Sequence, residues 1–495
     1  MQVVLVSTNA RKYSLEKQIV RATVPKGEQL LTLKTIQAAL ENRGIKPRFF
    51  PESPLKIEVE PGTFRPTAEA ADNIKKAFAG VVGDNSQIVF GLSVTTENYW
   101  LYEVLSQIIR AEYPGATIIS GGPHFKREEL FVNGKKIHDP VEIALGNNLS
   151  DGIVVGGCSP FISYLAEGGH SFSAIREPGL FWLEDGKVAG HGWGRFPRLD
   201  KVPYSRTDSG LTILFRNACQ NRCNFCSIVW SKTNYSEMAI QRTIDELASA
   251  PEQYIHIDDP NVFEPSQLDF YSRTLRAIKI PRKEISLDPS SLLVDHPFYR
   301  GISNGILAKE FGVYSYFFGR DSVTAEDAGG IGSKLRGKVK TRGQLDREGE
   351  ALQRFIEAGI RNQWVGPGNQ KLPFWVRVSY ILSPFDTMES IIKKTGEMDR
   401  FTWGREGGHL DVQPQYQLLV PFPGTRVRRE NIQHIKEPEN FAGHMLNRNV
   451  WSESLGPQVS FLDEFLSEEE YYRPGIGENA PLYDDFIDDL LEKYM

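Results

Sequence analysis

The sequence predicts an α/β protein with a doubly wound, Rossmann-like N-terminal domain, a partial (β/α)6 barrel and a helical C-terminal tail. Apolar strand candidates alternate with helical patterns through residues 1–165, which is typical of βαβ units in a parallel sheet. Six further strand candidates, again separated by helical patterns, lie between residues 205 and 430. Because six strands are fewer than the eight of a closed barrel, we expect this barrel to be open on one side.

The predicted N-terminal domain follows a strand–helix order. Its first strand covers residues 3–7, and a polar loop then leads to a helix over residues 30–40, which Gly44 ends. The later elements are a strand at 46–50, a helix around 74–78, a strand at 87–94, a helix at 101–109, and strands at 116–120 and 152–155 with a helix at 161–165. Ligands of such sheets bind at the carboxyl ends of the strands.

A linker at residues 166–204, with a hairpin formed by residues 181–183 and 187–189, is expected to join the two domains. The barrel strands are expected at 211–215, 253–257, 285–288, 314–319, 376–382 and 415–420, with helices at 239–248 and around 352–356. Residues 431–495 form the aromatic, partly acidic tail, which we expect to cap the barrel or to recognise substrate.

Bulk properties narrow the function classes. The net charge of −6 argues against a broad nucleic-acid-binding surface. Neither a long apolar run nor a signal peptide is found, so we expect a protein without a membrane span. Four cysteines in 495 residues are too few for a disulfide scaffold, and their clustering favours a reducing, cytoplasmic location.

Three of the four cysteines follow the pattern CxxxCxxC in the loop after the strand at 211–215, namely Cys219, Cys223 and Cys226. Three thiolates can bind three irons of a [4Fe–4S] cluster and leave the fourth iron open. A zinc site or three unrelated buried thiols are the alternatives, but structural zinc requires four ligands and no second pair is present. Cys158 cannot hold a second cluster alone and is expected to be a buried thiol in a turn.

The spacing of the cysteines, with the aromatic Phe225 before the last one, resembles the signature of the radical S-adenosylmethionine (SAM) superfamily. The resemblance implies that the three cysteines ligate the cluster and that SAM chelates the open iron through its amino and carboxylate groups. It also implies that Phe225 packs beside the adenine. Such an enzyme would work anaerobically with an electron donor such as ferredoxin or flavodoxin.

Landmarks of the N-terminal domain resemble the cobalamin-binding domain fused to many radical SAM enzymes. They are Pro25 and Gly27, a Ser/Thr-rich loop, and a Gly-Gly-Pro-His turn. The cofactor-binding residues that this resemblance implies are Ser93, Thr95, Thr96, Gly121, Gly122, Pro123, His124 and Gly156. An ordinary βα turn with a hydrogen-bonded histidine is the alternative. Since no Asp-x-His-x-x-Gly run is present, residues 95–100 rather than a histidine ligand are expected beneath the cobalt.

Acidic residues follow two of the predicted barrel strands. Asp258 and Asp259 occupy the place where relatives contact the SAM amino group, although an acidic solvated turn is the alternative. Gly-Arg-Asp-Ser at 319–322 resembles a motif that contacts the SAM ribose and carboxylate, which implies roles for Arg320 and Asp321. Pro-Phe-Pro-Gly-Thr at 421–425 resembles a run at the last strand of cobalamin-fused members.

These resemblances imply a cobalamin-dependent radical SAM methyltransferase of class B, which moves a methyl group from SAM through methylcobalamin to an unactivated carbon. The substrate would be a peptide or protein side chain, as for the C-methyltransferases that act on methyl-coenzyme M reductase, or a small molecule. A cobalamin-dependent radical SAM enzyme that rearranges or cyclises its substrate is the second hypothesis. A non-catalytic corrinoid- or metal-binding module is the third.

Overall fold

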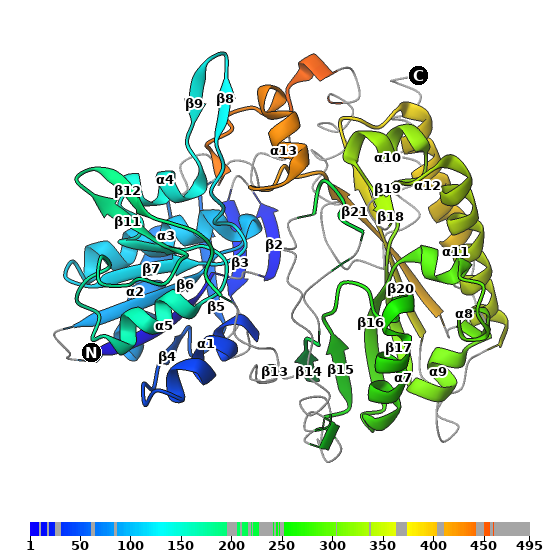
Figure 1. The fold of residues 1–495 in the computed structure, drawn as a ribbon, viewed down its shortest axis with the longest axis horizontal. Coiled ribbons are helices and arrows are strands. Elements are labelled where there is room, and N and C mark those ends of the chain that lie inside the picture. The colour runs from blue at the N-terminus through cyan, green and yellow to red at the C-terminus, as the bar shows by residue number, and fades with distance from the viewer. Residues whose placement is uncertain are drawn as a thin grey trace. The chain divides into compact units, whose positions relative to one another are not determined.

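The computed structural model forms two compact units, each built on a largely parallel sheet (Figure 1). The first unit comprises Met1–Ser205, Val420–Ser452 and Leu466–Arg473, and the second comprises Arg206–Leu419, Glu453–Phe465 and Pro474–Met495. The residues that the structure describes are 1–8, 11–16, 19–24, 31–60, 65–83, 87–195, 205–207, 210–215, 219, 221–226, 241, 244–245, 247, 252–302, 304–335, 338–362, 374–402, 410–441, 450–455 and 459. The predicted mixed α/β class with parallel sheets is confirmed.

The main sheet of the first unit has seven strands in the order β12-β11-β10-β7-β6-β1-β4. Its five parallel strands are β1 (Gln2–Ser7), β4 (Arg48–Phe50), β6 (Ile88–Ser93), β7 (Thr117–Gly121) and β10 (Gly152–Val154). This is the 2-1-3-4-5 order of a flavodoxin-like fold, in which the strand order reverses between the first and third strands. The reversal lies between β1 and β6 here, so the expected ligand crevice is at their carboxyl ends.

Two antiparallel strands extend this sheet beyond β10. They are β11 (Leu180–Glu184), which pairs with β10, and β12 (Lys187–Gly190), which pairs with β11. The hairpin expected in the linker therefore forms as predicted, but it is part of the sheet of the first unit.

Helices cover both faces of the sheet. α1 (Leu31–Glu41) and α5 (Ser159–Ala166) pack with Val3 and Leu5 on one face. α2 (Ala68–Val81), α3 (Tyr99–Glu112) and α4 (Pro140–Gly146) pack with Val4 and Val6 on the other. Because successive residues of β1 are buried on opposite faces, the strand is apolar throughout, as is typical of a parallel sheet covered on both sides.

An additional antiparallel sheet contains two strands in the region before residue 30 where the sequence predicts a polar loop, and a third strand for which the sequence analysis made no prediction. It consists of β2 (Arg11–Glu16), β3 (Ile19–Val24) and β5 (Leu55–Val59) in the order β2-β3-β5. Its strands alternate polar and apolar residues, and in β5 the alternate side chains Ile57 and Val59 are buried. The loop prediction was wrong because such a half-buried strand lacks the continuous apolar run that identified the other strands. A small hairpin, β8 (Leu130–Val132) and β9 (Lys135–Ile137), is also added.

Six strands of the second unit are parallel and adjacent: β14 (Gly210–Ile213), β15 (Tyr254–Ile257), β16 (Arg282–Leu287), β17 (Val313–Gly319), β20 (Phe374–Leu382) and β21 (Leu410–Leu418). They correspond to the six predicted barrel strands. β13 (Ser205–Thr207) lies beside β14 at the sheet edge. The helix expected at 239–248 falls mostly outside the described residues.

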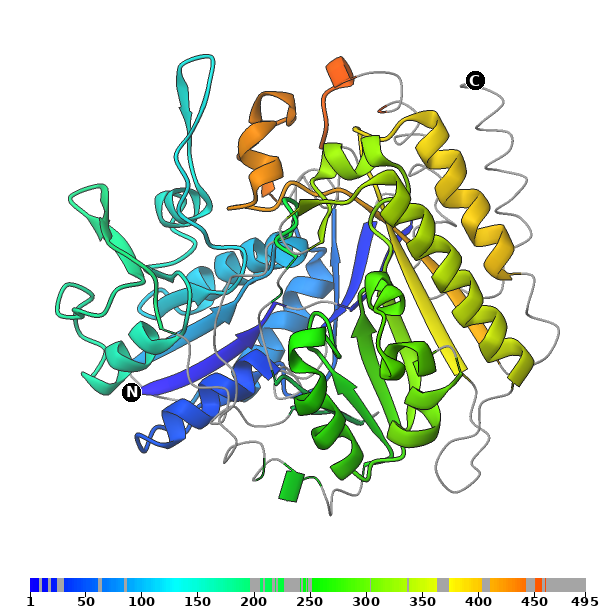
Figure 2. The ribbon, with the colours of Figure 1, turned by 45° about the vertical axis from the view of Figure 1, so that its right-hand side comes forward.

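The helices of the second unit are α7 (Leu268–Ala277), α8 (Pro297–Ile302), α9 (Ile306–Phe311), α10 (Ala325–Ile331), α11 (Arg342–Asn362) and α12 (Met388–Thr402). Two short 3-10 helices, η4 (Pro265–Gln267) and η5 (Pro289–Leu293), and a two-stranded ribbon, β18 (Lys334–Leu335) and β19 (Lys338–Val339), complete the connections. Figure 2 shows α11 and α12 side by side along the sheet.

After β21 the chain returns to the first unit. This return segment (residues 420–452) contains α13 (Arg426–Glu430) and the short helix η8 (Ile432–His434), and η9 (Glu453–Leu455) follows it. Arg428 donates to Glu128 at 2.7 Å, and Phe441 packs in the main core of the first unit. Most of the predicted tail beyond residue 455 falls outside the described residues. Within the described part of the chain, no helix is both long and apolar enough to cross a bilayer.

Glu103 on α3 should make stability depend on pH. Burial raises the pKa of its carboxyl from 4.5 to about 7, so the folded state binds this proton more tightly than the unfolded state. The contribution of the Glu103 carboxyl to the free energy of unfolding is therefore greatest below about pH 4.5, and it falls as the pH rises towards 7. We expect Glu103→Gln to raise the free energy of unfolding by roughly 1–2 kcal/mol at about pH 8 and by much less at about pH 4.

Urea denaturation at the two pH values would measure this effect. Glu112→Gln, an exposed substitution on the same helix, should give no gain at either pH. Equal effects of Glu103→Gln at both pH values would show that burial does not raise the pKa of this carboxyl.

Candidate functional site

The three motif cysteines lie at the carboxyl end of β14, the first strand of the parallel series. Cys219, Cys223 and Cys226 are half-buried and none forms a disulfide. Burial raises the pKa of the Cys219 thiol to about 11, and the neighbouring Cys226 adds to this effect. Burial also raises the pKa of Cys223, to which Cys226 again contributes. Cys226 is therefore near enough to both other thiols to oppose their ionisation.

Three cysteines in one loop are a donor set whose chemistry would suit an iron–sulfur cluster. In the described part of the chain, no three His, Cys, Asp or Glu side chains converge closely enough to hold one ion. An iron–sulfur cubane spreads its thiolate ligands over separate irons, so its ligands need not converge on one point. Three thiolates from one loop match that requirement, whereas structural zinc would require a fourth ligand.

The cysteine loop (residues 219–226) rests on the segment that follows α10. The backbone N–H of Lys334 donates to Cys223 Sγ at 3.3 Å, and Lys334 Nζ donates to Asn224 Oδ1 at 2.7 Å. The backbone N–H of Asn224 donates to the Gly332 carbonyl at 3.0 Å. Gly332 has a φ of +66°, and a Cβ there would lie 2.3 Å from Asn224 Nδ2. Only glycine therefore allows this contact.

Asp259 braces the start of the loop. Its carboxylate is 1% exposed and accepts hydrogen bonds from the Phe215 backbone N–H, at 2.7 Å, and from the Tyr271 hydroxyl. Asp258 differs, since 60% of its side chain is exposed, and its carboxylate lies 3.5 Å from His256 Nε2. Contact with the SAM amino group stays a prediction for both, and the geometry favours Asp258 because its carboxylate is accessible.

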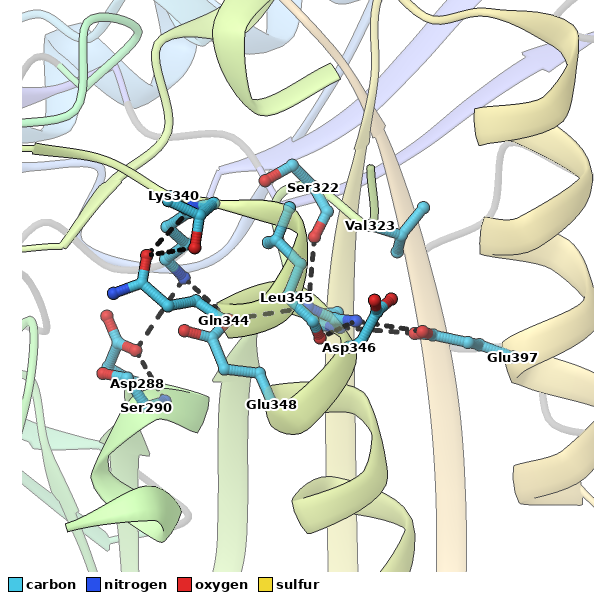
Figure 3. A network of polar contacts seen from close by, with 12 residues as sticks. Asp288, Ser290, Ser322, Val323, Lys340, Gln344, Leu345, Asp346, Glu348 and Glu397 are labelled. Atoms are coloured by element: carbon cyan, nitrogen blue, oxygen red, sulfur yellow. Dashed lines mark hydrogen bonds and ion pairs between the residues drawn. The ribbon is translucent and has the colours of Figure 1, made fainter. Parts of the chain in front are cut away.

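Arg320 is at the centre of a buried polar network, and its partners Ser322, Leu345 and Glu397 are labelled in Figure 3. Its guanidinium donates to the Leu345 carbonyl at 2.8 Å, to Glu397 Oε1 at 2.9 Å and to the Ser322 carbonyl at 3.2 Å. Glu348 Oε2 lies 3.5 Å away. Because protein acceptors already surround all three guanidinium nitrogens, the geometry favours a supporting role for Arg320 over a direct clamp on the SAM carboxylate.

A second buried cation extends this network to the cysteine loop. Lys340 Nζ lies 3.1 Å from Glu348 Oε2 and 3.9 Å from Asp288 Oδ1 (Figure 3). Asp288 in turn accepts a hydrogen bond from Asn221, within the loop. The network therefore ties the loop to the carboxyl ends of β16 and β17. Sequence reasoning missed Asp288 and Lys340, although the position of Asp288 at the carboxyl end of a predicted strand was a signal that could have found it.

Asp321 follows β17 and is half-buried. Burial raises the pKa of its carboxyl to about 6, Asp288 adds to this, and Lys340 opposes it. Its charge also contributes to the raised pKa of Cys223. Its contact with SAM stays a prediction. Phe225 is half-buried within the loop, and its place beside the adenine also stays a prediction.

In the first unit, the two predicted cofactor segments come together at the carboxyl ends of β6 and β7. The Val94 N–H donates to the Gly121 carbonyl at 2.7 Å, and His124 Nδ1 lies 3.1 Å from Thr96 Oγ1. Gly122 has a φ of +121°, and a Cβ there would lie 2.3 Å from the Val94 carbonyl oxygen. This close approach of two backbones explains Gly122 without a ligand.

The other predicted residues of this edge differ in exposure. His124 is fully buried, with its ring centroid 4.5 Å from that of Tyr99 and 4.8 Å from that of Phe441. Thr95 Oγ1 accepts from Asn98 Nδ2 at 2.9 Å, and the Ser93 carbonyl accepts from Thr8 Oγ1. Pro123 is exposed, and Gly156 bridges to Gly194 with a φ of +92°. The segment 95–100 includes Trp100, which belongs to the core.

Comparison with known proteins gives one informative result. No protein-family model matches this sequence, and no curated protein matches it. Among solved structures, the chain is similar to the apo, selenomethionine-labelled cobalamin-dependent S-adenosylmethionine radical enzyme OxsB, with a TM-score of 0.53 and 14% sequence identity over 91% of this chain. The two chains share a fold. The match spans 64% of the OxsB chain, so this protein corresponds to only part of that structure.

Asp259 is buried and Asp258 is exposed, so substituting each of them tests whether Asp259 holds Phe215 and Tyr271 in place. Asp259→Asn replaces one accepting oxygen by an NH2 group, which would face the Phe215 N–H or the Tyr271 hydroxyl. We expect it to lower the free energy of unfolding by roughly 2 kcal/mol, because a buried donor is left unsatisfied. Asp258→Asn, at the exposed position, should change it by less than about 0.5 kcal/mol. Urea denaturation of both variants measures the difference, and equal losses would contradict the brace.

Proposed function

We propose that the protein is a cobalamin-dependent radical SAM C-methyltransferase that transfers a methyl group from SAM to an unactivated carbon. One observation carries the proposal: three cysteines share a loop directly after the first of six parallel strands, in a chain whose other unit has a flavodoxin-like sheet. The fold similarity to OxsB supports the same class. A peptide or protein side chain or a small molecule would be the substrate, and ferredoxin or flavodoxin the electron donor.

In the second unit, Cys219, Cys223 and Cys226 would hold three irons of the cluster. When bound, the cluster would supply an electron that cleaves SAM to a radical, and the corrinoid would carry the methyl group. The chain contributes control of the cluster environment. The Lys334 N–H already points at Cys223 Sγ, and hydrogen bonds to cluster sulfurs raise the reduction potential by stabilising the added charge. Asn224 fixes the loop in the position where this bond forms.

SAM would bind at the carboxyl ends of β15 and β17, next to the cysteine loop. We assign the amino group to the accessible carboxylate of Asp258 and a polar group of the ribose or methionine to Asp321. The raised pKa of Asp321 means that its carboxyl would bind as an acceptor mainly above about pH 6. Arg320 and Lys340 would hold the backbone around the SAM site in place through a hydrogen bond and an ion pair.

Cobalamin would bind at the carboxyl edge of the first unit, where the strand order reverses between β1 and β6. The loop that carries Ser93 and Thr95 and the turn that carries Gly121 and Gly122 lie at this edge. His124 is turned into the aromatic core and held by Thr96. We therefore assign His124 to support of the turn and not to the cobalt.

The reaction type can be tested with isotopically labelled SAM. The full chain would be reconstituted anaerobically with iron, sulfide and cobalamin, reduced, and given SAM with a deuterated methyl group together with candidate peptides and small molecules. Methyl transfer should yield S-adenosylhomocysteine, 5′-deoxyadenosine and a labelled product. Deoxyadenosine without S-adenosylhomocysteine would contradict methyl transfer and favour rearrangement or cyclisation. If neither product forms, the protein would be a non-catalytic binding module.

Cluster ligation has an independent test. Cys223→Ala removes one of three thiolates, and we expect iron and sulfide content and the brown absorbance of the reconstituted protein to fall several-fold. Cys158→Ala is the matched control, since this thiol lies in the first unit, where burial raises its pKa to about 11. Full iron content in Cys223→Ala, or an equal loss in Cys158→Ala, would refute the assignment.

A further inference from the structure

Lys126 is a buried cation without a counter-ion in the described part of the chain. It follows the Gly121–His124 turn at the carboxyl end of β7 and is only 6% exposed. Its Nζ lies 4.8 Å from the centre of the Trp193 ring. No carboxylate raises its pKa, and burial lowers that pKa to about 8. Because burying a charge is unfavourable unless it is paired, this ammonium requires an explanation.

The nearest carboxylate in sequence is already paired. Glu128 Oε1 accepts from Arg428 Nε at 2.7 Å, and its Oε2 accepts from the Gly424 N–H at 2.8 Å. Both side chains of this ion pair are nearly fully buried. Since Arg428 neutralises Glu128, this carboxylate is not available as the counter-ion of Lys126.

The return segment holds the stem of Lys126 in place. Gly424 has a φ of +76°, and a Cβ at this position would lie 2.9 Å from Lys126 Cγ. The turn at 421–425 therefore needs glycine so that the lysine stem can lie against it. Burial of the stem with its charged end at the Trp193 ring restricts where the ammonium can point.

Trp193 is the second residue that lies against Lys126. Its ring lies against the end of β10, where a Cβ on Gly156 would come within 3.0 Å of Trp193 Cε3. The side chain is nevertheless 46% exposed. Because β7 and β10 are neighbouring parallel strands, Lys126 and Trp193 meet at the carboxyl edge of the sheet, where ligands of doubly wound folds bind.

We propose that Lys126 and Trp193 form a subsite for the phosphate group of a ligand. The Lys126 ammonium would neutralise the negative charge of the phosphate. Lysine commonly binds phosphate in this way, as a point charge. The exposed part of the Trp193 ring would contact the adjoining apolar or planar portion of the ligand. The phosphodiester of the nucleotide tail of a corrinoid and a phosphorylated substrate are the two sources of this group. The phosphate subsite itself does not depend on the proposed reaction.

The first experiment uses the full chain without cofactors and titrates it with inorganic phosphate. Intrinsic fluorescence should change saturably in the wild type, and Trp193→Phe should abolish that change. We expect Lys126→Met to weaken the apparent affinity by roughly tenfold or more, and Lys126→Arg to retain most of it. Lys135→Met is the matched control, because it removes the same charge from an exposed position on β9 of the same unit.

Thermal unfolding would show that the variants are folded before they are compared. An absent or non-saturable response in the wild type, or unchanged affinity in Lys126→Met, would overturn the proposal. An equal loss in Lys135→Met would also overturn it, because the response would then reflect net charge only.

A second experiment identifies the source of the phosphate. Binding of cobalamin is compared with binding of cobinamide, which lacks the nucleotide tail. Weaker binding of cobalamin but not of cobinamide to Lys126→Met would assign the subsite to the corrinoid tail. Unchanged binding of both, beside a lost phosphate response, would assign it to a phosphorylated substrate. Since the phosphate titration involves no cofactor, it can succeed where methyl transfer fails, and the reverse also holds.

Discussion

Pairing of buried charge is the constraint on which the second unit depends. Arg320 lies between Glu348 and Glu397, Lys340 between Glu348 and Asp288, and Lys394 between Asp327 and Asp386, in each case with side chains largely removed from water. Charges buried in this way are tolerated only when their partners are in place. The loops at the carboxyl ends of β16, β17 and β20 are therefore fixed relative to one another by electrostatics as well as by packing.

The cysteine loop benefits from this rigidity although it contains few apolar residues. Asn221 connects it to Asp288, and Asn224 connects it to Gly332 and Lys334, while Asp259 holds Phe215 in the segment before the loop. The first unit uses a different device. Its loops approach one another through glycine backbones, as at Gly122 and Gly424, where a side chain would not fit.

The parallel strands could be predicted from the sequence because burial on both faces produces continuous apolar runs. The sequence was insufficient for β2, β3 and β5, whose alternating residues resemble a polar loop. The role of Arg320 depends on Glu397, which is 77 residues away, and no local pattern shows that the two side chains meet. Likewise, the difference between Asp258 and Asp259 is one of exposure, which neighbouring identical residues do not reveal.

The return segment has a consequence for the order in which the protein folds during synthesis. Domains at the amino terminus usually fold first as the chain emerges from the ribosome. Here Phe441 belongs to the main core of the first unit, and Arg428 neutralises Glu128 from 300 residues further along. The core of the first unit therefore receives these two side chains only after residues Arg206–Leu419 of the second unit have been translated. Until then the core of the first unit lacks an aromatic side chain, and a buried carboxylate lacks its cation.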